Sequence, residues 1–223
     1  MRHNRLTRAD RDFVFAAVAD ERRQIAHLID GLDETALASP SLCEGWDIRT
    51  VAAHLVSVFA DSFWVFQATA LRRRSLARAI DELARRRAQL STDVIAATLH
   101  RNADYPLSPP VFGPLDPLAD ILVHSGDIRI PLGLSFSPRP ERTQLALDFL
   151  TRPWRIGFVP RGRLRGLRLC ANDVDRSWGA GLEVRGPAAA LMMAAAGRIA
   201  TLDALDGAGL SLLRDRISTP SGT

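Results

Sequence analysis

The sequence contains no lysine, because all 29 of its basic residues are arginine. Without a side-chain amine, Schiff-base catalysis and the lysine of a P-loop are excluded. Cysteine is also scarce: Cys43 and Cys170 lie far apart and belong to no paired motif. This argues against a disulfide framework and against a zinc ribbon. A lone cysteine is more often a small buried apolar residue than a reactive thiol.

Long apolar runs are missing as well. No run approaches the roughly 18 residues of a membrane span, and the basic residues 1–12 lack the apolar stretch of a signal peptide. We therefore expect a cytoplasmic protein without membrane contact. The net charge of +4 permits weak contact with anions, but it is a poor argument for a nucleic-acid partner, and we expect none.

What the sequence does contain is apolar residues at helical spacing. They predict helices over about 8–32, over 48–69 behind Asp47 as N-cap, and over 75–101. A fourth helix is predicted after Asp116 as cap, with Pro117 as its first residue. The arginine runs at 72–74 and 85–87 are typical of solvated helix faces or ends. Four amphipathic segments favour a helical bundle.

The pattern changes after residue 137. A further helix is predicted over 141–150, and the alternation of apolar residues with arginine over 162–173 indicates a strand. A turn at 175–181 and a partner strand over 181–186 follow, and then a helix that begins at Pro187 and ends near Gly197. We expect a mainly α fold: a four-helix bundle over 1–137, a small α+β domain over 138–217, and a flexible tail over 218–223.

An acid, a histidine and a second acid lie within eight residues of the otherwise apolar segment "DPLADILVHSGDIRIPLG". Asp120 and His124 are four residues apart, so they project from the same face of the predicted helix, and Asp127 lies near the same stripe. Buried ionisable groups are costly unless they are paired or hold a metal. The spacing alone leaves two interpretations open, since an acid and a histidine four apart often form only a surface pair.

His54 is a second polar residue in apolar surroundings, in "TVAAHLVSVF". Its spacing from neighbouring apolar residues predicts that it points into the bundle core, as a hydrogen-bonded core histidine or as a metal ligand. Two bundle helices that point ligands inward form a recurring kind of metal site, and two histidines with one carboxylate leave an open position on a zinc-like ion. His3 and His100 lack such surroundings, and His27 is a weaker inward candidate.

Three blocks, in order, carry a family resemblance: "GWDIRTVAAHL", "DPLADILVHSGDIRIPLG" and "WGAGLEVRGPAAALMMAAAGR". Over roughly residues 10 to 215 the chain resembles the mycothiol-dependent maleylpyruvate isomerase family, within the DinB-like helical-bundle superfamily. The resemblance implies a divalent metal, usually zinc, held by His54, Asp120 and His124. Family members with established activity have glutamate at the acid position. Aspartate is one methylene shorter but keeps the ligand type.

The resemblance also implies a reaction. Mycothiol would bind the metal as a thiolate and attack a small electrophile such as a small organic acid. Addition to a cis double bond, rotation and release would make the protein an isomerase, and retention of the thiol would make it an S-transferase. An arginine of the C-terminal domain would hold the acid: Arg198 is the better match and Arg185 the weaker one.

Several interpretations stay open at this level. Asp127 is either an acceptor for a ligand imidazole N–H or a helix-surface partner for Arg129 or another arginine. We expect an actinobacterial-type protein, and its oligomeric state stays open between a monomer and a homodimer. The alternative to an enzyme is a non-catalytic metal-binding or regulatory protein on the same scaffold, since fold does not fix function.

Overall fold

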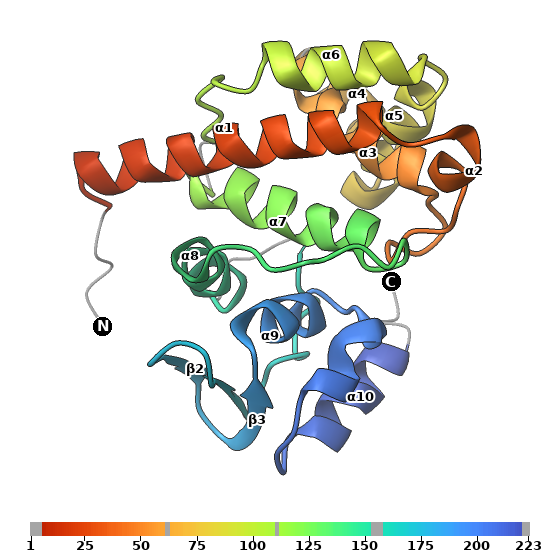
Figure 1. Cartoon of the computed structure of the whole chain (residues 1–223). Coiled ribbons are helices and arrows are strands. Elements are labelled where there is room, and N and C mark those ends of the chain that lie inside the picture. Colours follow the sequence, from red (N-terminus) through yellow and green to blue (C-terminus); the bar gives the residue numbers. More distant parts are fainter. Residues whose placement is uncertain (1–5, 61–62, 110–111, 153–157, 220–223) are drawn as a thin grey trace. The chain divides into compact units, whose positions relative to one another are not determined.

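A computed structural model describes residues 6–60, 63–109, 112–152 and 158–219. The described residues are mainly helical with one small three-stranded sheet (Figure 1), and this confirms the predicted fold class. The chain divides into two compact units, residues 1–107 with 127–134 and residues 108–126 with 135–223. The domain division at residue 137 stays a prediction.

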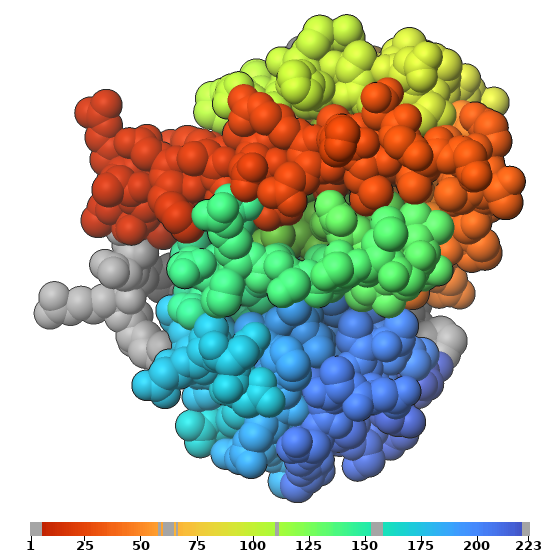
Figure 2. Space-filling model, in the orientation of Figure 1, coloured from red at the N-terminus to blue at the C-terminus, as the bar shows by residue number. Residues whose placement is uncertain are grey.

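The first unit begins with α1 (Arg8–Asp30), whose start is fixed by a capping box. The Thr7 hydroxyl accepts from the Asp10 N–H at 3.1 Å, and the Asp10 carboxylate accepts from the Thr7 N–H at 2.9 Å. A short helix, α2 (Glu34–Leu37), follows within the segment expected to be a polar connection. Helix α1 packs lengthwise against α6 (Thr92–Arg101) (Figures 1 and 2).

Helix α3 (Ile48–Ala60) starts where Asp47 predicts it. The Asp47 carboxylate accepts from the Thr50 N–H at 2.7 Å, which is the hydrogen bond that an N-cap side chain supplies. Helix α4 (Phe63–Arg73) covers most of the remaining predicted segment, and residues 61–62 lie outside the described residues. Helix α3 packs against both α5 and α6.

The single helix predicted over 75–101 is wrong, because two helices occupy this stretch. Helix α5 (Leu76–Arg87) ends at its C-cap Ala88, and α6 begins after Ser91, whose backbone is extended. Serine favours the N-cap position, and Asp93 in the first turn of α6 adds a favourable charge there. The apolar spacing continues across the break, which is why the pattern did not reveal it.

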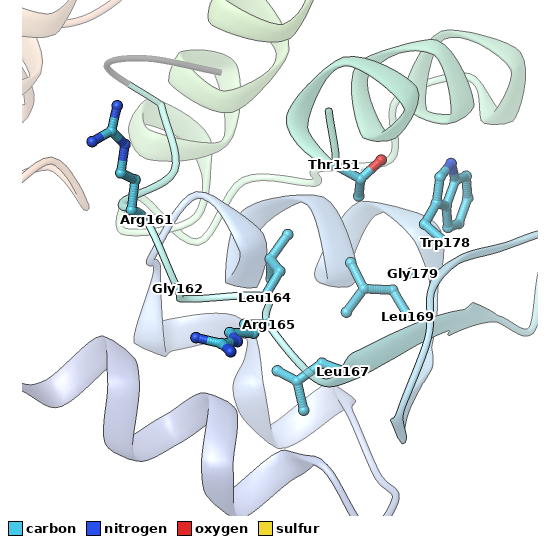
Figure 3. A pocket seen from close by; sticks show the side chains of 9 residues that line it. All are labelled: Thr151, Arg161, Gly162, Leu164, Arg165, Leu167, Leu169, Trp178 and Gly179. Carbon is cyan, nitrogen blue, oxygen red and sulfur yellow. The ribbon is translucent and has the colours of Figure 1, made fainter. Parts of the chain in front are cut away.

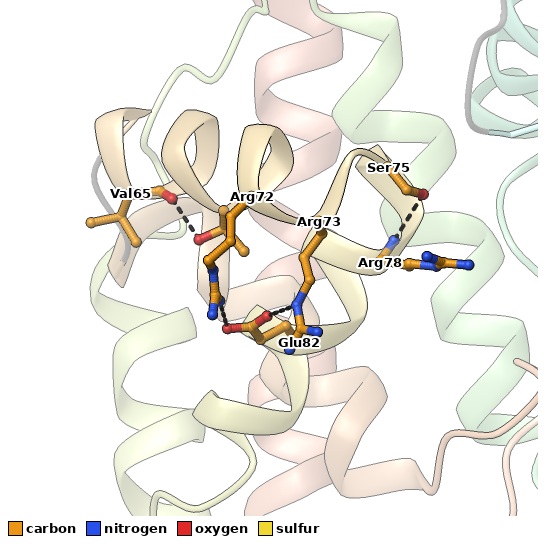
Figure 4. A network of polar contacts seen from close by, with 7 residues as sticks. Val65, Arg72, Arg73, Ser75, Arg78 and Glu82 are labelled. Carbon is orange, nitrogen blue, oxygen red and sulfur yellow. Dashed lines mark hydrogen bonds and ion pairs between the residues drawn. The ribbon is translucent and has the colours of Figure 1, made fainter.

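The arginine runs mark helix ends, as predicted. Arg72 and Arg73 lie in the last turn of α4, and both form ion pairs with Glu82 of α5 (Figure 4). Ser75 caps α5 by accepting from the Arg78 N–H at 3.4 Å. Arg72 and Arg73 are exposed and Glu82 is half-buried, so water still reaches the ion pairs and the network stabilises the α4–α5 corner only modestly.

Arg22 is one of several polar residues buried in the mainly apolar core of the first unit, together with Glu21, Thr50, Thr69 and Asp127. Arg22 is only 3 % exposed, and its guanidinium donates to the backbone carbonyls of Ala103 and Tyr105 at 2.9 and 2.8 Å. It also lies 4.6 Å from the ring centroid of Phe59. Arg22 therefore ties α1 to the segment that follows α6. The large buried apolar side chains of this unit include Val14, Val18, Ile25, Ile29, Ile48, Val51, Leu83, Ile95 and Leu99.

The second unit contains most of α7 (Leu115–Arg129), together with α8 (Pro140–Leu150) and α9 (Ala188–Ala195), which pack on each other. Helix α7 begins at Leu115, so Asp116 lies in its first turn rather than in front of it. Gly126 of α7 faces Met193 of α9: a Cβ there would lie 2.6 Å from the Met193 Cε, so glycine permits the close approach. Pro187 is the N-cap of α9 instead of its first residue.

The sheet differs from the predicted pair of strands. Its strands are β1 (Leu167–Ala171), β2 (Ser177–Gly179) and β3 (Leu182–Gly186), in the order β2-β1-β3. Strand β2 occupies the segment predicted as a turn and pairs antiparallel with β1, whereas β3 runs parallel to β1. The 3₁₀ helix η1 (Ile199–Ala204) and α10 (Leu210–Ser218) complete the unit, and residues 220–223 of the predicted tail lie outside the described residues.

Candidate metal site

Helix α7 presents the acid and the histidine that the spacing predicts. The His124 Nε2 lies 3.5 Å from the Asp120 Oδ1, one helical turn apart. His124 is 8 % exposed, and the helix around the pair carries fully buried apolar residues such as Leu118 and Leu122. The pair is therefore not the exposed surface pair that the spacing alone would allow.

Another acid, Asp116, lies on the same face of α7 as Asp120 and His124, closer to the start of the helix. Asp116 lies one turn before Asp120 and is partly buried. Burial, with a smaller contribution from the negative charge of Asp120, raises the pKa of the Asp116 carboxyl to about 7. From the sequence, Asp116 was expected only to cap the helix. Its i, i+4 spacing from Asp120 was the signal that could have included it in the stripe.

His54 comes from α3 and is half-buried. Its imidazole lies beside the indole of Trp46, with the ring centroids 5.3 Å apart and the planes tilted by 46°. Trp46 is itself fixed, because its Nε1–H donates to the Asp81 carboxylate at 2.7 Å. Because the Trp46 indole is held in place beside it, the His54 imidazole can adopt fewer orientations.

The structure brings the three predicted ligand residues together. His54, Asp120 and His124 each offer one ligand atom, and these atoms all lie within 4.8 Å of one another. In a tetrahedral zinc site the ligand atoms are about 3.4 Å apart when each is about 2.1 Å from the ion. The 3.5 Å between the Asp120 and His124 atoms matches this spacing. Two imidazoles and one carboxylate are also the donor types that zinc accepts.

The other histidines that were considered as ligands from the sequence do not lie in this group. His27 is exposed, so the weaker expectation that it points inward is wrong, because it lies on the solvent side of α1. His100 is exposed in the last turn of α6, as expected. His3 lies outside the described residues.

Asp127 is fully buried, with no exposed side-chain surface. The carboxylate therefore does not lie on the helix surface, where the interpretation of Asp127 as a surface partner for Arg129 or another arginine would place it. Its backbone carbonyl accepts from the Leu42 N–H at 3.2 Å, which joins the end of α7 to the segment before α3.

The two candidate arginines lie in different surroundings. Arg198 follows α9 directly after Gly197, which has a φ of +98°, and its Nη1 donates to the Ala196 carbonyl at 2.7 Å. Arg185 is exposed on β3, and its guanidinium pairs with Glu183. Of the two, only Arg198 is partly buried.

A third arginine, Arg163, was not singled out from the sequence. Its Nη1 lies 3.5 Å from the Ala195 carbonyl at the end of α9. Burial and the nearby positive charge of Arg198 lower the pKa of Arg163. Two guanidinium groups thus gather at the carboxyl end of α9, where the helix dipole favours positive charge.

The fold and the donor set describe a helical protein with a candidate metal site of two histidines and an aspartate. The model of the mycothiol maleylpyruvate isomerase N-terminal domain matches residues 18–129, about half of the chain. This match spans all three candidate ligands. The chain belongs to this family.

Two solved structures share the fold: the mycothiol-dependent maleylpyruvate isomerase and a histidine-to-alanine mutant of it. Each matches with a TM-score of 0.57 and 15 % sequence identity, over 91 % of this chain and 93 % of the other. The likeness therefore extends well beyond the N-terminal domain. A comparison with curated proteins found no match. Among the described residues, no helix is long and apolar enough to cross a membrane.

Proposed function

We propose that the protein is a mycothiol-dependent metalloenzyme that acts on a small, electrophilic organic acid. The observation that carries the proposal is the convergence of His54, Asp120 and His124 within 4.8 Å. Membership of the isomerase family supports cis–trans isomerisation of a maleylpyruvate-type acid as the reaction. S-transfer by the same site is the second reaction that this donor set would allow.

His54, Asp120 and His124 would hold one divalent metal, which we propose to be zinc because the donors are nitrogen and carboxylate oxygen. With only three protein ligands, such an ion keeps one position open. When bound, the metal would lower the pKa of the mycothiol thiol and so supply a thiolate that can add reversibly to a cis double bond.

The residues of the chain have separate tasks in this proposal. Trp46 limits the orientation of the His54 imidazole. Arg198 would bind a carboxylate of the substrate through two N–H donors, and the positive charge of Arg163 would add to the attraction. The buried Asp127 carboxylate would accept a hydrogen bond from a ligand imidazole and so fix its tautomer. Asp116, with its raised pKa, could hold a proton close to the metal position near neutral pH.

The experiment is to load the purified chain with zinc and to mix it with mycothiol and maleylpyruvate. Isomerisation of the acid with no net loss of free thiol supports the isomerase. Loss of thiol to maleylpyruvate, or to a bimane electrophile, supports S-transfer instead. If zinc binds but neither reaction exceeds the background, the non-catalytic alternative replaces the enzyme. If the chain binds no divalent metal, the proposal is wrong.

A further inference from the structure

A pocket of about 430 Å³ lies beside the small sheet of the second unit, but it offers a ligand no converging charges (Figure 3). The side chains of Arg161 and Arg165 point apart there. A polar arrangement in the first unit leads directly to a candidate metal ligand instead. It connects helix α5 to His54 through the indole of Trp46.

Asp81 of α5 holds the indole of Trp46 by its polar edge. The Asp81 Oδ1 accepts from the Trp46 Nε1–H at 2.7 Å, and the same oxygen accepts from the Arg85 Nε at 2.9 Å. Hydrogen bonds to an ionised carboxylate are shorter and stronger than those between neutral groups. An indole has only one N–H to donate, so this bond fixes the direction in which the ring points.

The backbone beside the indole is held as well. The Arg85 Nη2 donates to the carbonyl of Gly45, the residue directly before Trp46, at 2.8 Å. Within the turn 41–46, the backbone N–H and the hydroxyl of Ser41 donate to the Trp46 carbonyl at 3.0 and 2.8 Å. The turn thus fixes the backbone of Trp46, and α5 fixes both its ring and the residue before it.

The indole that is held in this way lies against the imidazole of His54. The ring centroids are 5.3 Å apart, within the usual range of aromatic pairs, and the planes are tilted by 46°. His54 lies within α3 and is half-buried. A metal binds an imidazole only when a ring nitrogen points at the ion, so a neighbour that limits the orientation of the ring before binding favours the bound state.

We propose that Asp81 is a positioning residue for His54, and that it acts through Trp46 while Arg85 holds its carboxylate. His54 is a metal ligand under the proposed function, so this inference rests on that function. Partners outside the ligand set typically contribute 10- to 100-fold to metal affinity. We expect an effect at the lower end of this range, because Asp81 acts through one more side chain than such a partner does.

The first experiment uses metal-free protein with labelled histidine and records the imidazole signals by NMR. The ring current of Trp46 shifts the His54 proton signals, which are identified by their loss in His54→Gln. Asp81→Ala should move these signals toward those of a histidine without an aromatic neighbour, because the indole loses its anchor. Asp81→Asn keeps an oxygen that accepts from the indole N–H, so it should leave the signals close to their native positions.

The matched control in this experiment is Glu82→Ala. Glu82 is the next residue of α5 and also an acid, but it pairs with Arg72 and Arg73 at the α4–α5 corner (Figure 4). Its removal should leave the His54 signals unchanged. Unmoved His54 signals in Asp81→Ala, or an equal movement in Glu82→Ala, would overturn the inference.

The second experiment measures the zinc affinity of the full chain by competition with a chromophoric chelator. Asp81→Ala and Trp46→Phe should each weaken zinc binding about tenfold. The phenyl ring of Trp46→Phe lacks the N–H that Asp81 binds, so the double variant should bind zinc no more weakly than Trp46→Phe alone. Losses that multiply to about 100-fold would contradict the inference, because Asp81 would then act on the ion independently of Trp46.

Urea unfolding of the zinc-free variants separates positioning from a general loss of stability. Asp81→Asn should restore native zinc affinity, and Glu82→Ala should keep it. A zinc affinity that falls in step with stability in Glu82→Ala as well as in Asp81→Ala would overturn the inference. A native chain that binds no zinc would overturn the proposed function alone, and the NMR signals of metal-free protein would still decide whether Asp81 holds the His54 ring.

Discussion

Two groups of charged side chains in this protein use the same residue types in opposite environments. At the α4–α5 corner, Glu82 is exposed enough to remain solvated, and hydrogen bonds from Arg73 in particular lower its pKa. On α7, Asp116 and Asp120 lie among buried apolar residues, and burial raises the pKa of Asp116 to about 7.

The two environments indicate which group of charged side chains has a chemical role. Exposed ion pairs gain little, because water and salt screen them. Acids and a histidine gathered in a partly buried place cost free energy unless something compensates for their charge. A divalent metal is the compensating group that the α7 stripe and His54 would accommodate. Substitutions in the α7 group should affect metal binding and catalysis, whereas substitutions at the α4–α5 corner should not and therefore serve as controls.

The largest effect is expected from the ligand residues. His124→Ala should lower zinc affinity by at least about 100-fold and abolish thiol-dependent turnover, because even changes outside the ligand set can cost 10- to 100-fold. Asp120→Asn should also lose most metal, whereas Asp120→Glu should retain it, since it keeps a carboxylate ligand. Elemental analysis after dialysis measures the metal. Glu82→Gln is the control and should bind as much zinc as the native chain.

The next effect concerns substrate binding by arginine. Arg198→Gln should lower kcat/KM for an acidic substrate by roughly 10- to 100-fold, since a hydrogen bond to a charged group contributes about 1.5–3 kcal/mol. Arg185→Gln is the matched control, because Arg185 is exposed and already paired with Glu183. Steady-state kinetics of both variants measure the effect. Equal losses would mean that overall charge, rather than Arg198, attracts the substrate.

A third prediction uses the raised pKa of Asp116 in metal-free protein. Between pH 4 and pH 7 the unfolded chain has lost the Asp116 proton and the folded chain keeps it, so the free energy of unfolding falls as pH rises. The loss is at most about 4 kcal/mol, because one pKa unit corresponds to about 1.4 kcal/mol. Asp116→Asn should flatten this slope. Urea unfolding in the presence of a chelator, at several pH values, tests it, and an unchanged slope would refute the assignment.

The smallest effect is expected at the exposed corner. Glu82→Gln removes the ion pairs with Arg72 and Arg73, and thermal unfolding should show little change at neutral pH. Because the pKa of Glu82 is lowered in the folded state, the small contribution of these ion pairs to the free energy of unfolding is present at neutral pH. This contribution is lost as the pH falls through the folded-state pKa. A large drop in melting temperature at neutral pH would contradict the contrast between the two groups.

Local signals predicted much of the helical part. The predicted cap Asp47 stands at the start of α3, and the apolar spacing follows the buried faces of α1 and α3. The break between α5 and α6 was missed because apolar spacing can continue through a turn. Strand β2 was missed because its three residues lie in a segment rich in glycine and charge, and only pairing with β1 makes it a strand. Helix α10 is short and gave no periodic signal that stood out.

The candidate site was predictable to a similar degree. His54, Asp120 and His124 were identified because each is a polar residue at an inward position of an apolar helix. Asp116 was assigned to a helix cap, since its place in the first turn of α7 depends on where the helix begins. Arg163 could not be found, because its proximity to Arg198 arises from the packing of a loop against the end of α9.

A crystal structure of zinc-loaded protein, with anomalous scattering recorded at the zinc edge, tests the proposed metal site most directly. We expect one strong anomalous peak per chain, within bonding distance of His54, Asp120 and His124, and no peak in crystals of His124→Ala. A zinc peak held by other residues, or none in fully loaded protein, would contradict the proposed site.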